Sequence, residues 1–196
     1  MKKWLLFVVV AMLVAISFFA AVKKTHKELP IYGQVPAFEF QDQAGKSFSS
    51  GELSNRVWVA GFIFTRCMGP CPIISAKMAE LKKRLSYASN FSLVSFSVDP
   101  EHDSSEKLAE YALKFQNTGK PQWHFLTGAK DRVYELAIKT FMQTASDDAT
   151  QPDVQARFMH GTRVSLVDDQ GRIRGFYNIL EVDGVNQLEQ DIRSIL

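Results

Sequence analysis

Residues 57–72 read VWVAGFIFTRCMGPCP and contain both cysteines of the chain, Cys67 and Cys71. The run from Val57 to Phe64 is apolar and rich in β-branched and aromatic residues, which predicts a strand buried on both faces. Pro72 suits the first turn of a helix, where no backbone N–H is needed. The apolar spacing that continues this helix is four, three and four residues, through Ile74, Met78, Leu81 and Leu85. We therefore expect both thiols between a central strand and a helix N-terminus.

That placement has chemical consequences. The partial positive charge of a helix N-terminus favours a thiolate over a thiol, and Arg66 is expected to add to the effect. Three residues between the cysteines let both sulfurs face one point, where they could close a small disulfide ring or bind one soft metal ion. The alternatives are a permanent disulfide and a pair of inert core thiols.

The composition is that of an ordinary globular protein. The chain has 196 residues, of which 46% are hydrophobic and 22% charged, and its net charge is +2. This charge gives no reason to expect a nucleic acid as partner. Without its N-terminal segment the chain is long enough for one core and too short for two ordinary domains.

The N-terminal segment predicts a membrane anchor. The 19 residues from Trp4 to Val22 carry no charge, and Ser17 is their one hydroxyl residue. A cleaved signal peptide is the alternative, but no clear cleavage site follows the apolar run. We predict an anchor over residues 1–22, a linker over 23–34 and one domain over 35–196. A domain outside the cytoplasm lies in an oxidising compartment, so any thiol function depends on a reducing or metal-delivering partner.

The rest of the chain predicts a mixed α/β domain. Residues 35–48 indicate a hairpin with its turn at 42–46, and residues 91–98 a second buried strand. Asp103 and Glu106 have the spacing of a capping box that opens a helix. A short apolar piece at 123–126, a helix over 131–141, a second hairpin over 164–177 and a closing helix over 185–195 complete the predicted elements. The polar stretch 143–157 is expected to be a functional or mobile loop.

This order predicts parallel strands joined by helical crossovers, with antiparallel strands added by the last hairpin. The result is a mixed central sheet with helices on both faces. A cysteine pair of redox type after the first central strand favours a thioredoxin-like fold.

Two thiolates do not complete a metal site, because copper(I) accepts three soft ligands and structural zinc normally requires four. The candidates for a further ligand are His102, just beyond a strand end, and His160, between the polar stretch and a strand. His26 lies in the predicted linker and is a poor candidate, and a structural role is the default for a lone histidine such as His124.

Three other residues near these positions could take part. The thioethers of Met68 and Met159 could bind copper(I), although loop packing is the preferred interpretation of both. Asp99 could orient an imidazole or shift the pKa of a thiol.

Three blocks of sequence, with their spacing, resemble the Sco/SenC family from about Val35 to the C-terminus. They are FIFTRCxxxCP at 62–72, FSVDP at 96–100 with Asp103, and His160 followed by Asp168, Gly171 and Tyr177. Gly161 departs from the pattern, because Ser or Thr commonly follows the histidine.

The resemblance implies a membrane-tethered thioredoxin-like domain that faces the periplasm or the mitochondrial intermembrane space. It implies that Cys67, Cys71 and His160 bind one copper ion. It also implies a role in assembling the dinuclear copper centre of cytochrome c oxidase, as copper donor, as reductant of the target cysteines, or both. The implied partners are the copper-site subunit of the oxidase and another copper chaperone or a thiol reductant.

Three functions remain open at this point. The first is a copper-binding assembly factor, a metallochaperone rather than an enzyme. The second is a thiol-disulfide oxidoreductase, or a redox sensor, that uses Cys67 and Cys71 as a redox-active pair without obligatory metal. The third is a peroxiredoxin-like peroxidase, which ranks below the others. His160 favours the first function, whereas cysteines at a helix start serve all three.

Overall fold

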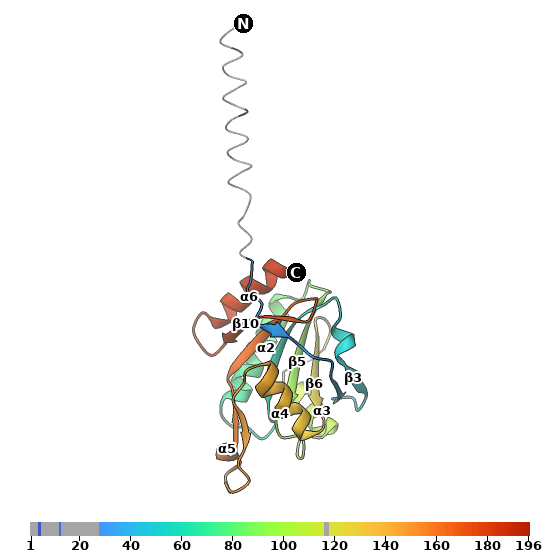
Figure 1. Cartoon of the computed structure of the whole chain (residues 1–196), viewed down its shortest axis with the longest axis vertical. Helices are drawn as coiled ribbons and strands as arrows, with labels where there is room; N and C mark the ends of the chain where they lie inside the picture. Colours follow the sequence, from blue (N-terminus) through green and yellow to red (C-terminus); the bar gives the residue numbers. More distant parts are fainter. Residues whose placement is uncertain (1–3, 5–11, 13–27, 116–117) are drawn as a thin grey trace.

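The computed structural model describes Trp4, Met12, residues 28–115 and residues 118–196 (Figure 1). Its strands are β1 (Gly33–Gln34), β2 (Glu39–Asp42), β3 (Ser47–Ser49), β4 (Val57–Ile63), β5 (Phe91–Ser97), β6 (Gln122–Thr127), β7 (Ala145–Asp147), β8 (Phe158–His160), β9 (Arg163–Val167) and β10 (Arg172–Asn178). Its helices are η1 (Ser50–Leu53), α2 (Pro70–Arg84), α3 (Ser105–Leu113), α4 (Lys130–Glu135), η2 (Leu136–Thr140), α5 (Val154–Arg157) and α6 (Gly184–Ile195).

The main sheet is mixed, as predicted. Its strand order is β1-β10-β9-β4-β5-β6-β2-β3, in which β4, β5 and β6 run parallel and the outer pairs are antiparallel. The two parallel connections pass through α2 and α3, and a parallel pair needs such long crossovers. All residues of β4 and of β5 are buried, which confirms the central strands predicted from the sequence.

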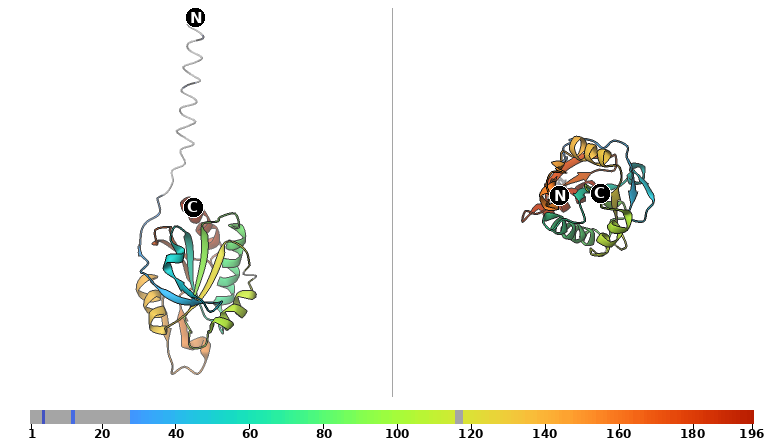
Figure 2. Two further views of the ribbon diagram at one scale, coloured as in Figure 1. Left: turned by 90° about the vertical axis from the view of Figure 1, so that its right-hand side faces the viewer. Right: turned by 90° about the horizontal axis from the view of Figure 1, so that it is seen from below.

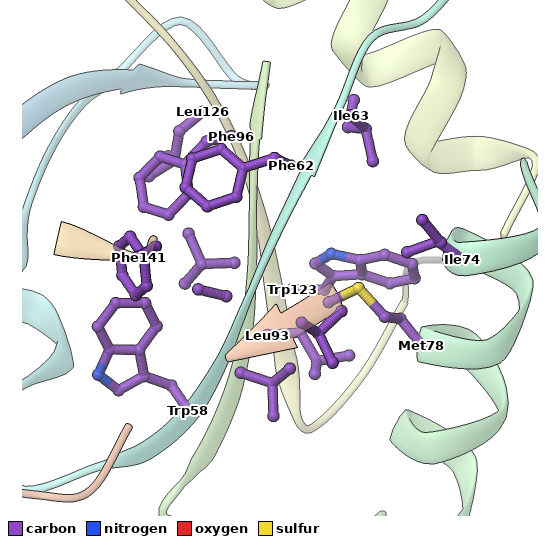
Figure 3. Packing of buried hydrophobic residues seen from close by; sticks show 14 of the residues in the cluster. Trp58, Phe62, Ile63, Ile74, Met78, Leu93, Phe96, Trp123, Leu126 and Phe141 are labelled. Carbon is purple, nitrogen blue, oxygen red and sulfur yellow. The ribbon is translucent and has the colours of Figure 1, made fainter. Parts of the chain in front are cut away.

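Helices cover both faces of the sheet (Figure 2). On one face, Trp58 and Phe62 of β4 pack edge-to-face on Phe141, which follows η2. On the other face lies α2, which approaches so closely that a Cβ atom at Gly61 would be 3.1 Å from Sδ of Met78. Figure 3 shows these two groups of side chains on opposite sides of the strand. The two-layered core fixes the ends of β4 and α2, and therefore the loop between them.

Three elements differ from the prediction. The short apolar piece at 123–126 is a full strand, β6, at the edge of the parallel set. The predicted helix 131–141 ends in a π-helical turn, η2. The polar stretch 143–157 is no structureless loop: it contains β7 and α5, and β7 pairs with β8 in a two-stranded sheet of its own. We call residues 143–160 the arm, and Figure 1 shows it projecting beyond the main sheet, at the end of the domain opposite α6.

The segment before β1 packs on the domain. Arg174 donates hydrogen bonds to the carbonyl oxygens of Leu29 and Pro30, and it also forms an ion pair with Asp168 at 2.8 Å. This part of the predicted linker is therefore joined to β10. The predicted anchor lies outside the described residues, apart from Trp4 and Met12. Among the residues that the structure describes, no helix is long and apolar enough to cross a membrane.

Candidate dithiol metal site

Both cysteines lie where the sequence predicts them. Cys67 belongs to the loop that leaves β4, where its N–H donates to the carbonyl of Phe64 at 3.2 Å, and Cys71 is the second residue of α2. Both are thiols rather than a disulfide. Cys67 is 6% exposed and Cys71 is fully buried. Both thiols are therefore buried, and Cys67 keeps a small exposed fraction that Cys71 lacks.

The pKa of Cys71 is raised far above the usual range of a thiol. The largest cause is a hydrogen bond to the side chain of Cys67, followed by burial and by the negative charge that Cys67 can carry. The backbone of Phe64 opposes the rise and Asp103 adds to it. The expectation that the helix N-terminus favours a thiolate is opposed at Cys71, because its hydrogen bond to Cys67 and its burial raise the pKa.

Arg66 forms an ion pair with Asp99. Its Nη2 lies 2.5 Å from Oδ2 of Asp99 and its Nε 3.0 Å from the same oxygen. Burial raises the pKa of Asp99, and the hydrogen bond and charge of Arg66 only partly offset that rise. Asp99 thus compensates the arginine and fixes the backbone of Arg66 beside Cys67.

Asp103 binds the start of the cysteine loop and is not a helix cap. Its carboxylate is buried and accepts from the N–H of Thr65 at 3.0 Å, from the Thr65 hydroxyl at 2.5 Å and from Ser97 Oγ at 2.6 Å. The residue that caps α3 is Ser104, which accepts from the N–H of Lys107. The spacing of the predicted capping box is therefore misplaced by one residue, and Asp103 instead joins the cysteine loop to the end of β5.

A buried hydrogen bond between Ser75 and Tyr111 lies close to the two cysteines. Ser75 lies one helical turn after Cys71 and shares a buried 2.9 Å hydrogen bond with the hydroxyl of Tyr111. Burial raises the pKa of Tyr111 above its usual value, Ser75 opposes the rise, and charge on either cysteine increases it. The phenol therefore stays neutral next to the sulfurs.

The arm brings the backbone of His160 to this end of the domain. His160 pairs with Ala145 across the two strands of the arm, and its side chain is outside the described part of the structure. Two residues earlier, the ring of Phe158 lies 5.2 Å from that of Phe64. Gln155 contacts the cysteine loop itself, because its Nε2 donates to the carbonyl of Arg66 at 2.8 Å. Among the side chains that the structure describes, no group of three or more His, Cys, Asp or Glu could hold a metal.

The other predicted ligand candidates have different surroundings. The ring of His124 packs at 4.4 Å on Phe48, and burial lowers the pKa of this imidazole, as in an ordinary structural histidine. The ring of His102 lies beside Lys107, with its two nitrogens 3.1 and 3.3 Å from Nζ. His26 and the side chain of Met159 lie outside the described part. Met68 is 83% exposed, so the expectation that it packs within the loop is wrong.

The structure explains why position 161 is a glycine, which the sequence alone does not reveal. A Cβ atom at this position would lie 2.0 Å from Oε1 of Gln143, whose buried side chain occupies that space. Within the described part of the chain, this oxygen has no hydrogen-bond partner. The roles of Gln143, Gln155 and Tyr111 were missed because each depends on a contact between distant parts of the chain, and no local pattern marks them.

The structure thus defines a class of protein: a thioredoxin-like α/β domain with a buried, coupled dithiol at the start of a helix. The family model of SCO1/SenC matches residues 30–196. The chain therefore belongs to the SCO1/SenC family. A SCO1 protein homolog from Bacillus subtilis is 35% identical over 172 residues, which cover 84% of each chain.

Solved structures agree with this assignment. A SCO1/SenC family lipoprotein from Bacillus anthracis is 28% identical, with a TM-score of 0.75 over 85% of this chain and 96% of that one. BsSco, a member of the Sco family of cytochrome c oxidase assembly proteins with an identified disulfide switch, is 32% identical, with a TM-score of 0.71 over 86% and 96%. The fold also matches Bradyrhizobium japonicum ScoI, solved with copper bound, at 21% identity and a TM-score of 0.69 over 83% of this chain and 99% of that one.

Proposed function

We propose that this chain binds one copper ion through Cys67, Cys71 and His160. The observation that carries the proposal is the pair of adjacent buried thiols, which offers two soft donors from one loop. The arm contacts this loop through Phe158 and Gln155, so the backbone of His160 belongs to the same end of the domain. Copper-bound structures of other family members support the choice of metal.

In this proposal the ion is a cargo that the protein passes on. The chain assists assembly of the dinuclear copper centre of cytochrome c oxidase, by copper delivery, by reduction of the target cysteines, or by both. Its partner is the copper-site subunit of the oxidase. A second partner is another copper chaperone, which supplies the ion, or a thiol reductant, which restores the dithiol. The description of BsSco as a member of a family of oxidase assembly proteins supports this role.

The test is an anaerobic copper titration with competing chelators of known affinity, in each oxidation state. We expect Cys67→Ser and Cys71→Ser to abolish tight binding. His160→Ala should weaken copper(I) modestly and copper(II) strongly, because copper(II) prefers imidazole more than copper(I) does. His124→Ala is the matched control, since its ring packs on Phe48. Equal affinities of wild type and His160→Ala in both states would exclude His160 as a ligand.

A second candidate function rests on the different exposure of the two thiols. A thiolate at Cys67 attacks a disulfide of the target and releases one target thiolate, and Cys71 then attacks the mixed disulfide and releases the other. The target gains two electrons and Cys67–Cys71 becomes a disulfide, which an external dithiol reduces again. The hydrogen bond between the two side chains supports such a reaction. If the wild type binds copper in neither oxidation state, this function replaces the first.

We also propose that residues 1–22 anchor the protein in a membrane and that the domain over 35–196 faces the periplasm or the mitochondrial intermembrane space. The uncharged run of 19 residues from Trp4 to Val22 supports an anchor. The Bacillus anthracis family member is described as a lipoprotein. Mass analysis of protein extracted from membranes should find the complete N-terminus, and a soluble form that begins after residue 17 would contradict the anchor.

A further inference from the structure

The carboxamide of Gln155 contacts the cysteine loop at two points. Its Nε2 donates to the carbonyl of Arg66 at 2.8 Å, and its Oε1 accepts from the N–H of Met68 at 2.9 Å. Arg66 and Met68 are the neighbours of Cys67 on either side. One side chain therefore binds the backbone across Cys67 in the way that a neighbouring strand would, although it is 87 residues away from Met68 in the sequence.

The other side of each contact is also fixed. The N–H of Gln155 donates to Oδ1 of Asp153, which caps α5. Beyond α5 the ring of Phe158 packs on Phe64, and the chain continues as β8 to His160. On the loop side, Arg66 is bound to Asp99. Gln155 thus joins the arm to the cysteine loop, and His160 follows it five positions later in the chain.

We propose that Gln155 is a positioning residue that sets the distance between the histidine-bearing arm and the two thiols. The inference rests on the proposed copper function, which it deepens. Cys67 and Cys71 come from one loop and one helix start, so their mutual position does not depend on the arm. The third ligand does depend on it. Loss of the Gln155 contacts should therefore weaken the binding of copper(II), which depends on the imidazole. It should leave the binding of copper(I), which two thiolates can hold, nearly unchanged.

The chemistry requires a carboxamide at this position. Glutamate would keep an acceptor for the N–H of Met68, but it would place a carboxylate oxygen against the carbonyl of Arg66, where Nε2 now donates. Alanine would remove both contacts. Gln151 provides a matched control, because it is a glutamine of the same arm whose side chain donates a hydrogen bond to Asp148 of that arm, at 3.4 Å.

The experiment uses the full chain in detergent, with the variants Gln155→Ala, Gln155→Glu and Gln151→Ala. Copper(I) and copper(II) affinities come from chelator competition, and the copper(II) site is recorded by electron paramagnetic resonance. Hydrogen exchange of the Met68 amide is measured without metal. Outer contacts of a metal ligand typically change affinity by roughly 10–100-fold, and we expect a loss of that size for copper(II) in both Gln155 variants. We expect an altered copper(II) spectrum, copper(I) affinity within about threefold of wild type, and no change in Gln151→Ala.

Exchange at the Met68 amide should become faster in Gln155→Ala, and this readout does not require copper. If the wild type binds no copper, the copper function fails while the exchange result still decides whether Gln155 holds the loop. Wild-type copper(II) affinity and spectrum in Gln155→Ala would overturn the inference. So would an equal loss of both copper states together with a lower melting temperature, because that is the result of a merely structural role.

Discussion

Replacement of Asp103 by alanine tests whether this carboxylate holds the cysteine loop. The change leaves the N–H of Thr65 and the hydroxyls of Thr65 and Ser97 without the acceptor that they share at 3.0, 2.5 and 2.6 Å. A buried donor left without a partner costs about 1–3 kcal/mol. The Thr65 hydroxyl is partly exposed and can turn to water, so we count only the Thr65 N–H and the buried Ser97 hydroxyl.

These two donors give a loss of about 2–6 kcal/mol. Removal of the buried carboxylate also removes its desolvation cost, so we expect a loss in the lower part of that range, about 2–4 kcal/mol. That is a large share of the roughly 5–15 kcal/mol that stabilises a typical domain. Asp103→Asn keeps one acceptor oxygen and the side-chain volume, and should lose about half as much. The control is Asp169→Ala, an exposed turn residue that differs from Asp103 in burial.

The assay is equilibrium unfolding in urea, with the slope of each transition compared to confirm that the same surface is exposed. The expected order of stability is Asp169→Ala, Asp103→Asn and Asp103→Ala, from highest to lowest. If Asp103→Ala unfolds within about 0.5 kcal/mol of the control, a loss that surface substitutions commonly show, the carboxylate does not hold the loop.

Three further predictions concern other parts of the domain. Gly161→Ser should lower the free energy of unfolding by about 1–3 kcal/mol, because the added side chain would overpack against Gln143. Gln143→Ala in the same chain should recover part of the loss. Thermal unfolding of the single and double variants measures both effects. Burial tends to raise the pKa of Asp168, but its hydrogen bonds with Arg174 and neighbouring groups outweigh burial and lower the pKa. The free energy of unfolding of the wild type should therefore fall as the pH drops below about 4. In urea unfolding at several pH values, Asp168→Asn should lose less stability over this acid range than the wild type does. Burial lowers the pKa of His124, so this imidazole opposes folding as the pH falls below 6.5, and His124→Phe should be relatively more stable than wild type at pH 5 than at pH 8.

The central part of the fold could be predicted because its signals are local. The apolar run at 57–64 has no alternative to a strand buried on both faces, and the spacing from Ile74 to Leu85 matches one face of a helix. The turn at 168–171 fixed the last hairpin in the same way. The cysteine pair then follows from chain order alone, since the loop between β4 and α2 has no other place to lie.

The supports of the site could not be predicted, because they are tertiary. Asp103 has the local spacing of a helix cap, but a buried acceptor for three donors on two other elements is worth more than a cap. The polarity of residues 143–157 indicates a loop. It does not show that β7 pairs with β8, because β8 follows in the chain only after α5. At Cys71 the neighbouring sulfur and burial raise the pKa, and burial is a tertiary effect that the helix dipole does not include.

Copper binding and thiol exchange use the same two sulfurs. In the metal-free pair Cys71 is fully buried, and its hydrogen bond to Cys67 and its burial raise the pKa of its thiol, which makes Cys67 the better candidate for the first attack on a target disulfide. In the proposed copper site the ion would bind the Cys67 thiolate and lower its nucleophilicity, so a metal-bound Cys67 would not attack a disulfide. Copper loading should therefore protect the dithiol from oxidation, and the formation of the Cys67–Cys71 disulfide should require release of the metal.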